Sequence, residues 1–388
     1  MTKKDWTVVK VSDCCDQISE RVDNPSESGF ERFVGLDHMK TREVTIRNWG
    51  NSADVTSAMK LFQDGDVLVA RRNVYLERAA TVRFAGVCSG DAIVLRTKAQ
   101  SPCITELLPF ILNTDQFWGY ANSQADGSMS KRLSVARLLD YEFPLPPIDE
   151  QRRIAELLWA ADDVIESLKK SLEKLLVVDS SMRFDFFSAE KDKVNLGDLV
   201  ADNRLSYKTG PFGTVLKASS YVDTGVPVVN PVNMKDGDFF VEDGPFISEQ
   251  EVERLAVYKI IENDLIFGRK GDIGRGIFST QQHEGYIVGS DCIRIRVLGN
   301  EIIPKYLFYF LTSPASKRLL ASYSHGTTMP GINEKMLSKM EVHIPEKQEQ
   351  REITNKLKEI DKAKSQLMSK IEMSYELKRN LLTNLLMG

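Results

Sequence analysis

The chain is poor in the residues from which metal and redox sites are built. Its 388 residues contain only 5 cysteines and 4 histidines. No two cysteines have the Cys-x-x-Cys spacing of a zinc ribbon, and no two histidines have His-x-x-x-His spacing. The odd number of scattered cysteines gives no sign of a disulfide framework either. We therefore expect neither a metal site nor a disulfide scaffold.

Motifs for nucleotide hydrolysis and DNA chemistry are missing as well. Residues 268–274 are rich in glycine but lack the Gly-Lys-Ser/Thr ending of a phosphate-binding P-loop. There is no Asn/Asp-Pro-Pro-Tyr/Phe tetrapeptide of the kind that amino-methyltransferases use, and no convincing Asp…Glu-x-Lys nuclease triplet. The sequence thus predicts no catalytic residue and no cofactor site in this chain.

Long apolar runs and an excess of positive charge are also lacking. No apolar stretch approaches the roughly 18 residues of a membrane span, and the first six residues contain no apolar signal region. We expect a cytoplasmic protein without a membrane partner. Its net charge of −4 argues against bulk electrostatic binding of nucleic acid. Any DNA contact would need basic residues gathered on one face, or charge from a partner.

The most informative feature present is an internal repeat. A chain of 388 residues exceeds what one hydrophobic core usually serves, and each of its halves contains a phrase built around Glu-Gln-Arg. Two further blocks match at nearly the same offset. The matching pairs are 146–154 with 345–353, 66–72 with 264–270, and 91–96 with 291–296. The repeat predicts two similar domains, each followed by the same kind of helix.

Both repeated phrases open a helix with an apolar seam. Three or more heptads with apolar a and d positions predict a coiled coil. A helix of about 38 residues spans roughly 57 Å, so an antiparallel pair needs no long return connection between the two domains. The seam residues are Ile154, Leu158, Ala161, Ile165, Leu168, Leu172, Leu175 and Met182 in the first helix, and Ile353, Leu357, Ile360, Leu367, Ile371, Leu381 and Leu385 in the second.

Two lysines interrupt the apolar seam of the second helix. Lys364 and Lys378 fall at seam positions. A polar seam residue can set the register of a coiled coil at some cost in stability. The interpretation we favour from the sequence is that both lysines extend along the seam edge into solvent.

The fold class that follows is α+β. We expect two similar mixed α/β domains joined by a long antiparallel two-helix coiled coil, with a pseudo-twofold internal repeat. The segments are a domain at 1–147, a helix at 148–188, a domain at 189–344 and a helix at 345–388. In the first domain we expect strands at 7–11, 33–36, 66–70, 81–84 and 92–96, helices at 13–22, 104–113 and 135–139, and a loop at 122–130.

Basic and polar residues of both domains are candidate DNA contacts: some occupy corresponding places in the two domains, and Tyr207, Lys208 and Lys217 flank the loop at 211–213. Arginine can bridge O6 and N7 of guanine, and arginine or lysine can neutralise phosphate. The alternative interpretation is a solvated hairpin tip or a plain loop; for Arg294 and Arg296 we favour a solvated sheet face. The candidates are Arg71, Arg72, Asn73, Lys131 and Arg132 in the first domain, and Tyr207, Lys208, Lys217, Arg269, Lys270, His325 and Thr327 in the second.

The whole chain resembles the specificity subunits of type I restriction–modification systems. Each motif alone is only moderately specific, but their order and duplication make the resemblance strong. The motifs are Leu145–Arg152 and Ile344–Arg351 with their following helices, Phe33–Met39, Thr209–Gly213, Gly225–Val228 and Asn263–Gly271.

The resemblance implies a non-catalytic DNA-recognition subunit. Each target-recognition domain would read one half of a bipartite, asymmetric site in double-stranded DNA, and the helices would set the spacing and dock two modification (methyltransferase) subunits. S-adenosylmethionine would bind those subunits, and ATP and Mg²⁺ would serve the restriction (motor) subunits. The expected docking residues are Glu150, Gln151, Arg152, Glu349, Gln350 and Arg351.

Two other functions remain open at this point. One is a coiled-coil scaffold for other proteins that reads no DNA sequence, and the other is a stand-alone DNA-modifying enzyme. The missing catalytic motifs count against the enzyme. A bipartite consensus selected from random DNA would exclude the scaffold.

Overall fold

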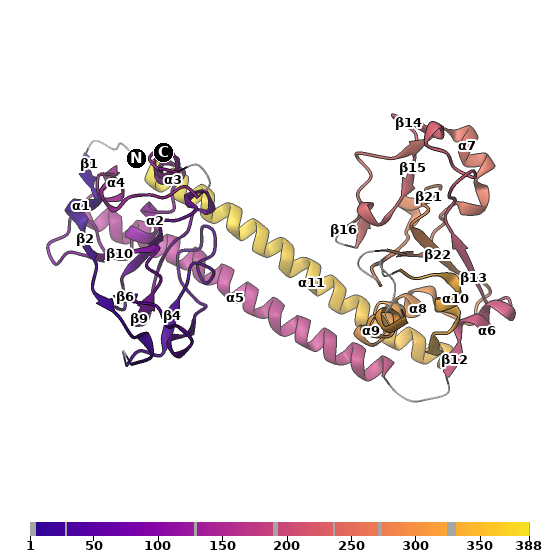
Figure 1. The fold of residues 1–388 in the computed structure, drawn as a ribbon. Helices are drawn as coiled ribbons and strands as arrows, with labels where there is room; N and C mark the ends of the chain where they lie inside the picture. Colours follow the sequence, from indigo (N-terminus) through magenta and orange to yellow (C-terminus); the bar gives the residue numbers. More distant parts are fainter. Residues whose placement is uncertain are drawn as a thin grey trace. The chain divides into compact units, whose positions relative to one another are not determined.

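The computed structural model describes residues 5–27, 29–127, 130–188, 193–235, 237–270, 274–323 and 331–387. The chain forms two compact units, Met1–Lys169 with Ser369–Gly388, and Lys170–Met368. Each unit contains one globular domain and a portion of two long helices, α5 (Ile148–Phe187) and α11 (Lys347–Leu382) (Figure 1). The helices are thus shared between the units and do not form separate linkers.

The first unit contains two largely antiparallel sheets and one short two-stranded antiparallel ribbon. The ribbon pairs β1 (Thr7–Lys10) with β11 (Glu142–Leu145). The four-stranded sheet has the order β2 (Cys15–Ile18), β10 (Ala92–Thr97), β7 (Val67–Ala70) and β8 (Ala79–Thr81). The five-stranded sheet has the order β3 (Arg21–Val22), β6 (Met59–Phe62), β9 (Gly86–Cys88), β4 (Arg32–Val34) and β5 (Gly50–Asn51).

Two hydrophobic clusters cover the two faces of the central strands. Side chains alternate across a strand, so Ile93 and Leu95 of β10 face one cluster while Ala92 and Val94 face the other. This double burial explains the continuous apolar run in these strands. The first cluster includes side chains of four helices, α1 (Val11–Cys14), α2 (Leu108–Ile111), α3 (Asp115–Ser123) and α4 (Val135–Leu139).

The second unit repeats the central sheet and the ribbon. Its ribbon pairs β12 (Lys193–Asn195) with β23 (Glu341–His343). Its four-stranded sheet has the order β13 (Leu205–Thr209), β22 (Cys292–Val297), β19 (Leu265–Gly268) and β20 (Gly276–Phe278). The duplicated sequence blocks therefore form the same strands in both units, which confirms the predicted repeat.

The rest of the second unit differs more from the first. A second sheet has the order β14 (Tyr221–Val222), β18 (Phe246–Ile247), β15 (Val226–Val229) and β21 (Ile287–Val288), and β16 (Met234–Lys235) pairs with β17 (Asp238–Phe239). The shorter helices are α6 (Leu196–Ala201), α7 (Glu249–Arg254), α8 (Pro304–Leu311), α9 (Pro314–Tyr323) and α10 (Glu334–Ser338).

The same bidentate ion pair braces the central sheet of each unit. The Nε and Nη2 groups of Arg96 both donate to the buried Asp66 carboxylate at 2.8 Å. Arg296 donates to the buried Asp264 in the same way, at 2.6 and 2.7 Å. Because both carboxylates are buried, each needs this charged partner, and the two arginines are structural.

Several predictions about local structure are wrong. Most of the segment 13–22, predicted as helix, is extended, because β2 pairs with β10 and β3 pairs with β6. The strand predicted at 81–84 is instead the end of β8 and a turn before β9. Arg294 does not lie on a solvated face: it is 6% exposed, and its Nη1 donates to the carbonyl of Lys259 at 2.6 Å.

The two long helices are antiparallel within each unit, as predicted. In the first unit, Ile154 and Leu158 at the start of α5 share a hydrophobic cluster with Leu381 and Leu385 near the chain end. In the second unit, Phe187 at the end of α5 shares a cluster with residues 353 and 357 at the start of α11. Within the described residues, no helix is long and apolar enough to cross a membrane.

The seam lysines are paired inside the structure. Lys378 is 9% exposed, and its Nζ lies 2.5 Å from Asp162. Lys364 lies 3.0 Å from Asp179 and 2.8 Å from Asp361. The interpretation that both lysines extend into solvent is therefore wrong. Each lysine pairs with an acid of α5, and these pairs fix the register of the two helices.

Candidate DNA interface and helix junctions

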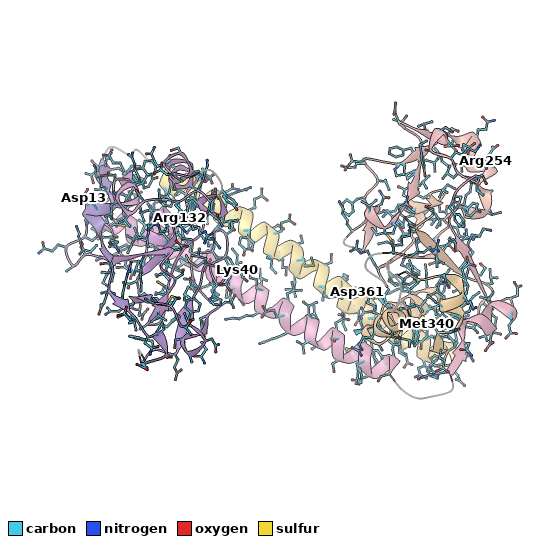
Figure 2. The ribbon with its side chains drawn as sticks, in the orientation of Figure 1. Asp13, Lys40, Arg132, Arg254, Met340 and Asp361 are labelled. Atoms are coloured by element: carbon cyan, nitrogen blue, oxygen red, sulfur yellow. The ribbon has the colours of Figure 1, made fainter. Side chains whose placement is uncertain are left out.

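Four of the candidate DNA contacts of the first unit come together beyond the end of β7. Asn73 donates its main-chain N–H to the carbonyl of Lys131 at 2.9 Å, and Arg72 donates from Nε to the hydroxyl of Ser130 at 3.1 Å. The side chains of Arg72 and Arg132 are 48% and 50% exposed. Two guanidinium groups are thus presented to solvent from neighbouring loops; Figure 2 labels Arg132.

An acid that the sequence analysis did not single out organises this group. Asp91, the residue before β10, lies 3.7 Å from Nη1 of Arg72 and 3.6 Å from Nη2 of Arg132. The main-chain N–H of Arg71 donates to the carbonyl of Asp91 at 2.9 Å. Arg71 itself is only half-buried, with its Nε enclosed, so it offers less to a ligand than Arg72 does.

The second unit has the same junction with different side chains. Arg269 donates its N–H to the carbonyl of Asp291 at 2.7 Å, and its guanidinium donates to the carbonyls of Ile332 and Ser290 at 3.3 and 3.2 Å. Arg269 is therefore held by main chain. Lys270 is the exposed cation, 55% accessible, with its Nζ 2.8 Å from the Asp291 carboxylate.

The other candidates of the second unit are not gathered into this group by any contact that the structure shows. Tyr207 packs against the hydrophobic core, and burial raises the pKa of its phenol. Nζ of Lys208 lies 5.0 Å from the ring centroid of Tyr258. Lys217 is exposed at the start of a short turn. His325 and Thr327 lie outside the described residues.

The glutamine of each repeated phrase is an internal clamp. Gln151 is 1% exposed; its Oε1 accepts from the N–H of Ile104 at 2.9 Å, and its Nε2 donates to the carbonyls of Pro102 and Pro146 at 2.8 Å each. These three bonds tie the loop before α2 to the start of α5. They also satisfy polar groups that burial would otherwise leave unpaired.

Gln350 makes the same three bonds in the second unit. Its Oε1 accepts from the N–H of Ile303 at 2.8 Å, and its Nε2 donates to the carbonyls of Glu301 and Pro345 at 3.1 and 2.8 Å. It too is 1% exposed. The repeated phrase thus joins each domain to the helix that follows it.

This geometry corrects part of the predicted docking set. The side chains of Gln151 and Gln350 are buried and fully engaged, so they present no surface to another subunit. The remaining predicted docking residues are exposed or half-buried and stay a prediction: Glu150, Arg152, Glu349 and Arg351.

A comparison with protein families matches nearly the whole chain. The family described as the type I restriction modification DNA specificity domain matches residues 3–176 and again residues 193–375. The chain belongs to this family. The two matches fall on the two repeats, so each domain together with its helix corresponds to one copy of the specificity domain.

Relatives and solved structures agree with the family. The MjaVIII specificity subunit of Methanocaldococcus jannaschii is 23% identical over 415 residues, which covers 99% of this chain and 93% of the relative. The EcoBI specificity subunit of Escherichia coli is 23% identical over 263 residues, covering 62% of this chain and 55% of the relative. The crystal structure of a type I S subunit from M. genitalium has a TM-score of 0.62 at 14% identity, covering 99% of this chain and 96% of that one. At this identity the structural likeness shows the fold alone.

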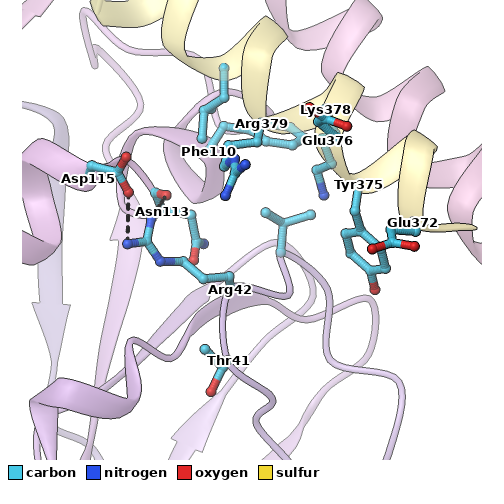
Figure 3. Close-up of a pocket in the computed structure, with 12 residues that line it drawn as sticks. Thr41, Arg42, Phe110, Asn113, Asp115, Glu372, Tyr375, Glu376, Lys378 and Arg379 are labelled. Carbon is cyan, nitrogen blue, oxygen red and sulfur yellow. Dashed lines mark hydrogen bonds and ion pairs between the residues drawn. The ribbon is translucent and has the colours of Figure 1, made fainter. Parts of the chain in front are cut away.

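The first unit also contains a cavity of about 570 Å³ beside α11 (Figure 3). Val44, Phe110 and Leu382 line it, and at its edge Arg42 lies 2.9 Å from Asp115. The candidate DNA contacts do not line it, so it is separate from the candidate interface.

The cavity marks a difference between the two units. In the second unit, the position that corresponds to Leu382 is occupied by Arg183 of α5. The guanidinium of Arg183 lies 5.0 Å from the ring centroid of Tyr309, the residue that corresponds to Phe110. The two repeats therefore share a frame but not their side-chain detail.

Proposed function

We propose that this chain is the DNA-recognition subunit of a type I restriction–modification complex and that each unit reads one half of a bipartite, asymmetric site. The observation that carries the proposal is the junction repeated in both units, where exposed basic side chains project beside Asp91 and Asp291. The same scaffold with different side chains suits two half-sites of different sequence. Curated relatives named as specificity subunits support a recognition role without catalysis.

The chemistry of the two junctions suits contact with a duplex. Arg72 and Arg132 can each form two parallel hydrogen bonds to a guanine edge or a phosphate, whereas Lys270 offers a compact charge. Phosphate contacts fix position, and base-edge contacts carry sequence information. The first unit thus has the stronger capacity for base readout at this place, and the second has the simpler phosphate contact.

Selection from random DNA tests this proposal. The assembled complex, containing this chain and its modification subunits, is incubated with a random duplex pool, and the methylated sites are sequenced. We expect a consensus with two specific blocks separated by a fixed gap. A complex that methylates DNA with no such consensus, or binds none, would contradict the proposal.

A matched pair of variants tests the junction itself. Arg72→Ala should relax the consensus in one block only, because Arg72 belongs to one unit. Arg254→Ala is the control, since its side chain has the same 48% exposure but pairs with Glu251 on α7 of the second unit and not with Asp91 or Asp291. Equal effects of the two substitutions would show that the junction has no special role.

The proposal extends to the partners. Modification subunits would dock on the helix pair. The partner subunits would bind S-adenosylmethionine, ATP and Mg²⁺. The assembled complex would act on DNA in the cytoplasm. In the first unit, Arg47 and Glu43 of the domain hold the flank of α5 that bears Asp162 and Lys169. The opposite flank is open to a partner.

That open flank contains exposed apolar side chains. Val164 follows Asp162 by two residues, or about 200° around the helix. Val164 and Leu157 of α5 and Leu377 of α11 are 52%, 44% and 58% exposed. Exposed large apolar side chains are typical of a protein interface. We expect Val164→Asp with Leu377→Asp to abolish co-purification of the modification subunit.

The control for docking is Val257→Asp, at a valine of comparable exposure (59%) on a turn of the second unit. Native mass spectrometry of the assembled complex measures the subunit ratio for each variant. Retention of the modification subunits by the Val164, Leu377 variant would place the docking surface elsewhere.

A further inference from the structure

In both units an acid stands among the cations that would meet DNA. Asp91 lies within 3.7 Å of Arg72 and 3.6 Å of Arg132, and Asp291 lies within 2.8 Å of Lys270. Each carboxylate thus occupies the place where a phosphate oxygen would bind those cations. DNA can engage these side chains fully only after they leave the carboxylate.

Each acid has a shorter side chain than the cations it meets and is less exposed than they are. The carbonyl of Asp91 accepts from the N–H of Arg71 at 2.9 Å, and its own N–H donates to the hydroxyl of Ser89 at 3.2 Å. The side chain of Asp91 is 26% exposed, against 48% for Arg72 and 50% for Arg132. Because a short side chain on a hydrogen-bonded main chain has less freedom than a long, exposed one, we expect the cations to move and the acid to stay.

The arrangement recurs although its cations differ. Asp291 takes the same place before its strand, with its carbonyl bonded to the N–H of Arg269 at 2.7 Å, but its partner is a lysine instead of two arginines. An exposed ion pair is weak enough for a well-placed ligand to break and strong enough to weaken a loose contact several-fold. The carboxylate also repels phosphate that approaches without displacing it.

We infer that Asp91 and Asp291 are positioning residues that raise specificity: each holds the basic side chains of its unit away from non-specific phosphate and releases them only to a matching half-site. A matching half-site supplies base-edge hydrogen bonds that replace the lost ion pair, whereas random DNA supplies phosphate alone. This inference rests on the proposed function, because it assumes that each unit reads DNA.

The test uses the assembled complex with Asp91→Asn or Asp291→Asn in this chain. Binding to the selected duplex and to a random duplex is measured by fluorescence anisotropy. For random DNA we expect affinity to rise by roughly two- to five-fold per substitution, the range that corresponds to losing one exposed ion pair. For the selected duplex we expect a smaller rise, so that the ratio of specific to non-specific affinity falls.

Two controls separate positioning from a simple change in net charge. Asp115→Asn removes the same charge from the first unit, at an acid that pairs with Arg42 at 2.9 Å and not with Arg72 or Arg132. Asp91→Glu keeps the charge at the junction and should restore most of the discrimination. A rise in random binding by Asp115→Asn as large as that by Asp91→Asn would overturn the inference.

The two half-sites give a readout that a structural role would not produce. Asp91→Asn should loosen the consensus in one block only, and Asp291→Asn in the other block only. Loosening of both blocks by one substitution, or of neither, would overturn the inference. If wild-type complex selects no consensus, the proposed function fails; if it selects one and both variants keep it unchanged, only this inference fails.

Discussion

Asp162→Asn should leave a lysine buried without its counter-charge. In the first unit, Asp162 accepts from Lys378 at 2.5 Å and from Arg47 at 2.7 Å. The side chains of Asp162 and Lys378 are 8% and 11% exposed. Burial by itself would raise the pKa of the Asp162 carboxyl, but the two cations outweigh it and hold this pKa below its usual range.

The expected cost follows from the burial of the pair. Removing one partner of a buried ion pair costs about 3–5 kcal/mol, because the other charge stays buried and uncompensated. In the variant, Arg47 retains its ion pair with Glu166 at 3.1 Å. Most of the lost stability therefore comes from Lys378. We therefore expect the free energy of unfolding to fall by about 3 kcal/mol. Replacing both charges, as Asp162→Leu with Lys378→Met, should recover all but about 1 kcal/mol of it.

Tryptophan fluorescence can follow this unit alone. The four tryptophans of the chain, Trp6, Trp49, Trp118 and Trp159, all belong to the first unit. Urea unfolding at pH 7, monitored by their emission, gives the free energy for each variant. Asp163→Asn is the matched control, because Asp163 is the exposed neighbour of Asp162 on the same helix. It should leave the transition unchanged.

Two results would refute this reasoning. One is a loss below about 1 kcal/mol for Asp162→Asn, which is the size of an exposed pair. The other is a double variant as unstable as the single one. The pH dependence gives a further check: a depressed folded-state pKa contributes stability above the unfolded pKa, and this contribution is lost as pH falls through the folded value. The difference between wild type and Asp162→Asn should therefore shrink below about pH 4.

Three further predictions concern the helices and the junctions. One extra heptad in both α5 and α11 adds about 10 Å of helix, so the gap in the selected DNA site should lengthen by about 3 base pairs; an unchanged gap would show that the helices do not set it. Gln151→Ala removes three internal hydrogen bonds and should lower the free energy of unfolding by about 1–3 kcal/mol in the tryptophan assay, whereas Gln116→Ala, on the exposed surface of α3 in the same unit, should not. Arg72→Ala should reduce the slope of log affinity against log salt concentration by about 1, and an unaltered slope would remove Arg72 from the phosphate contacts.

Much of the architecture could be predicted because it follows from patterns of residue types along the sequence. Heptads along α5 and α11 predicted two long helices, and the blocks beginning at Asp66 and Asp264 predicted matching strands. The same alignment also contained Asp91 and Asp291, although only contact with basic side chains revealed their role. A repeat shows which positions correspond, but it does not show which side chains meet.

The errors share one physical cause, which is contact between residues distant in sequence. The segment predicted as helix at 13–22 is extended because β10, some 80 residues later, provides a strand edge for it. Arg294 alternates with Arg296 as a solvated strand would, yet main-chain carbonyls enclose its guanidinium. Gln151 and Gln350 have the sequence context of surface residues at a helix start, and both are buried clamps.

By itself the sequence determined the duplication, the two long helices with their seams, and the family, because each is a pattern of residue types along the chain. The tertiary structure decided which cations are available to DNA. Arg71 and Arg269 were candidates on the same footing, but the guanidinium of Arg269 is held by main-chain carbonyls and Arg71 is half-buried with its Nε enclosed. Arg72, Arg132 and Lys270 stay exposed beside an acid. Exposure and pairing depend on what the fold brings alongside a side chain, and no local pattern contains that information.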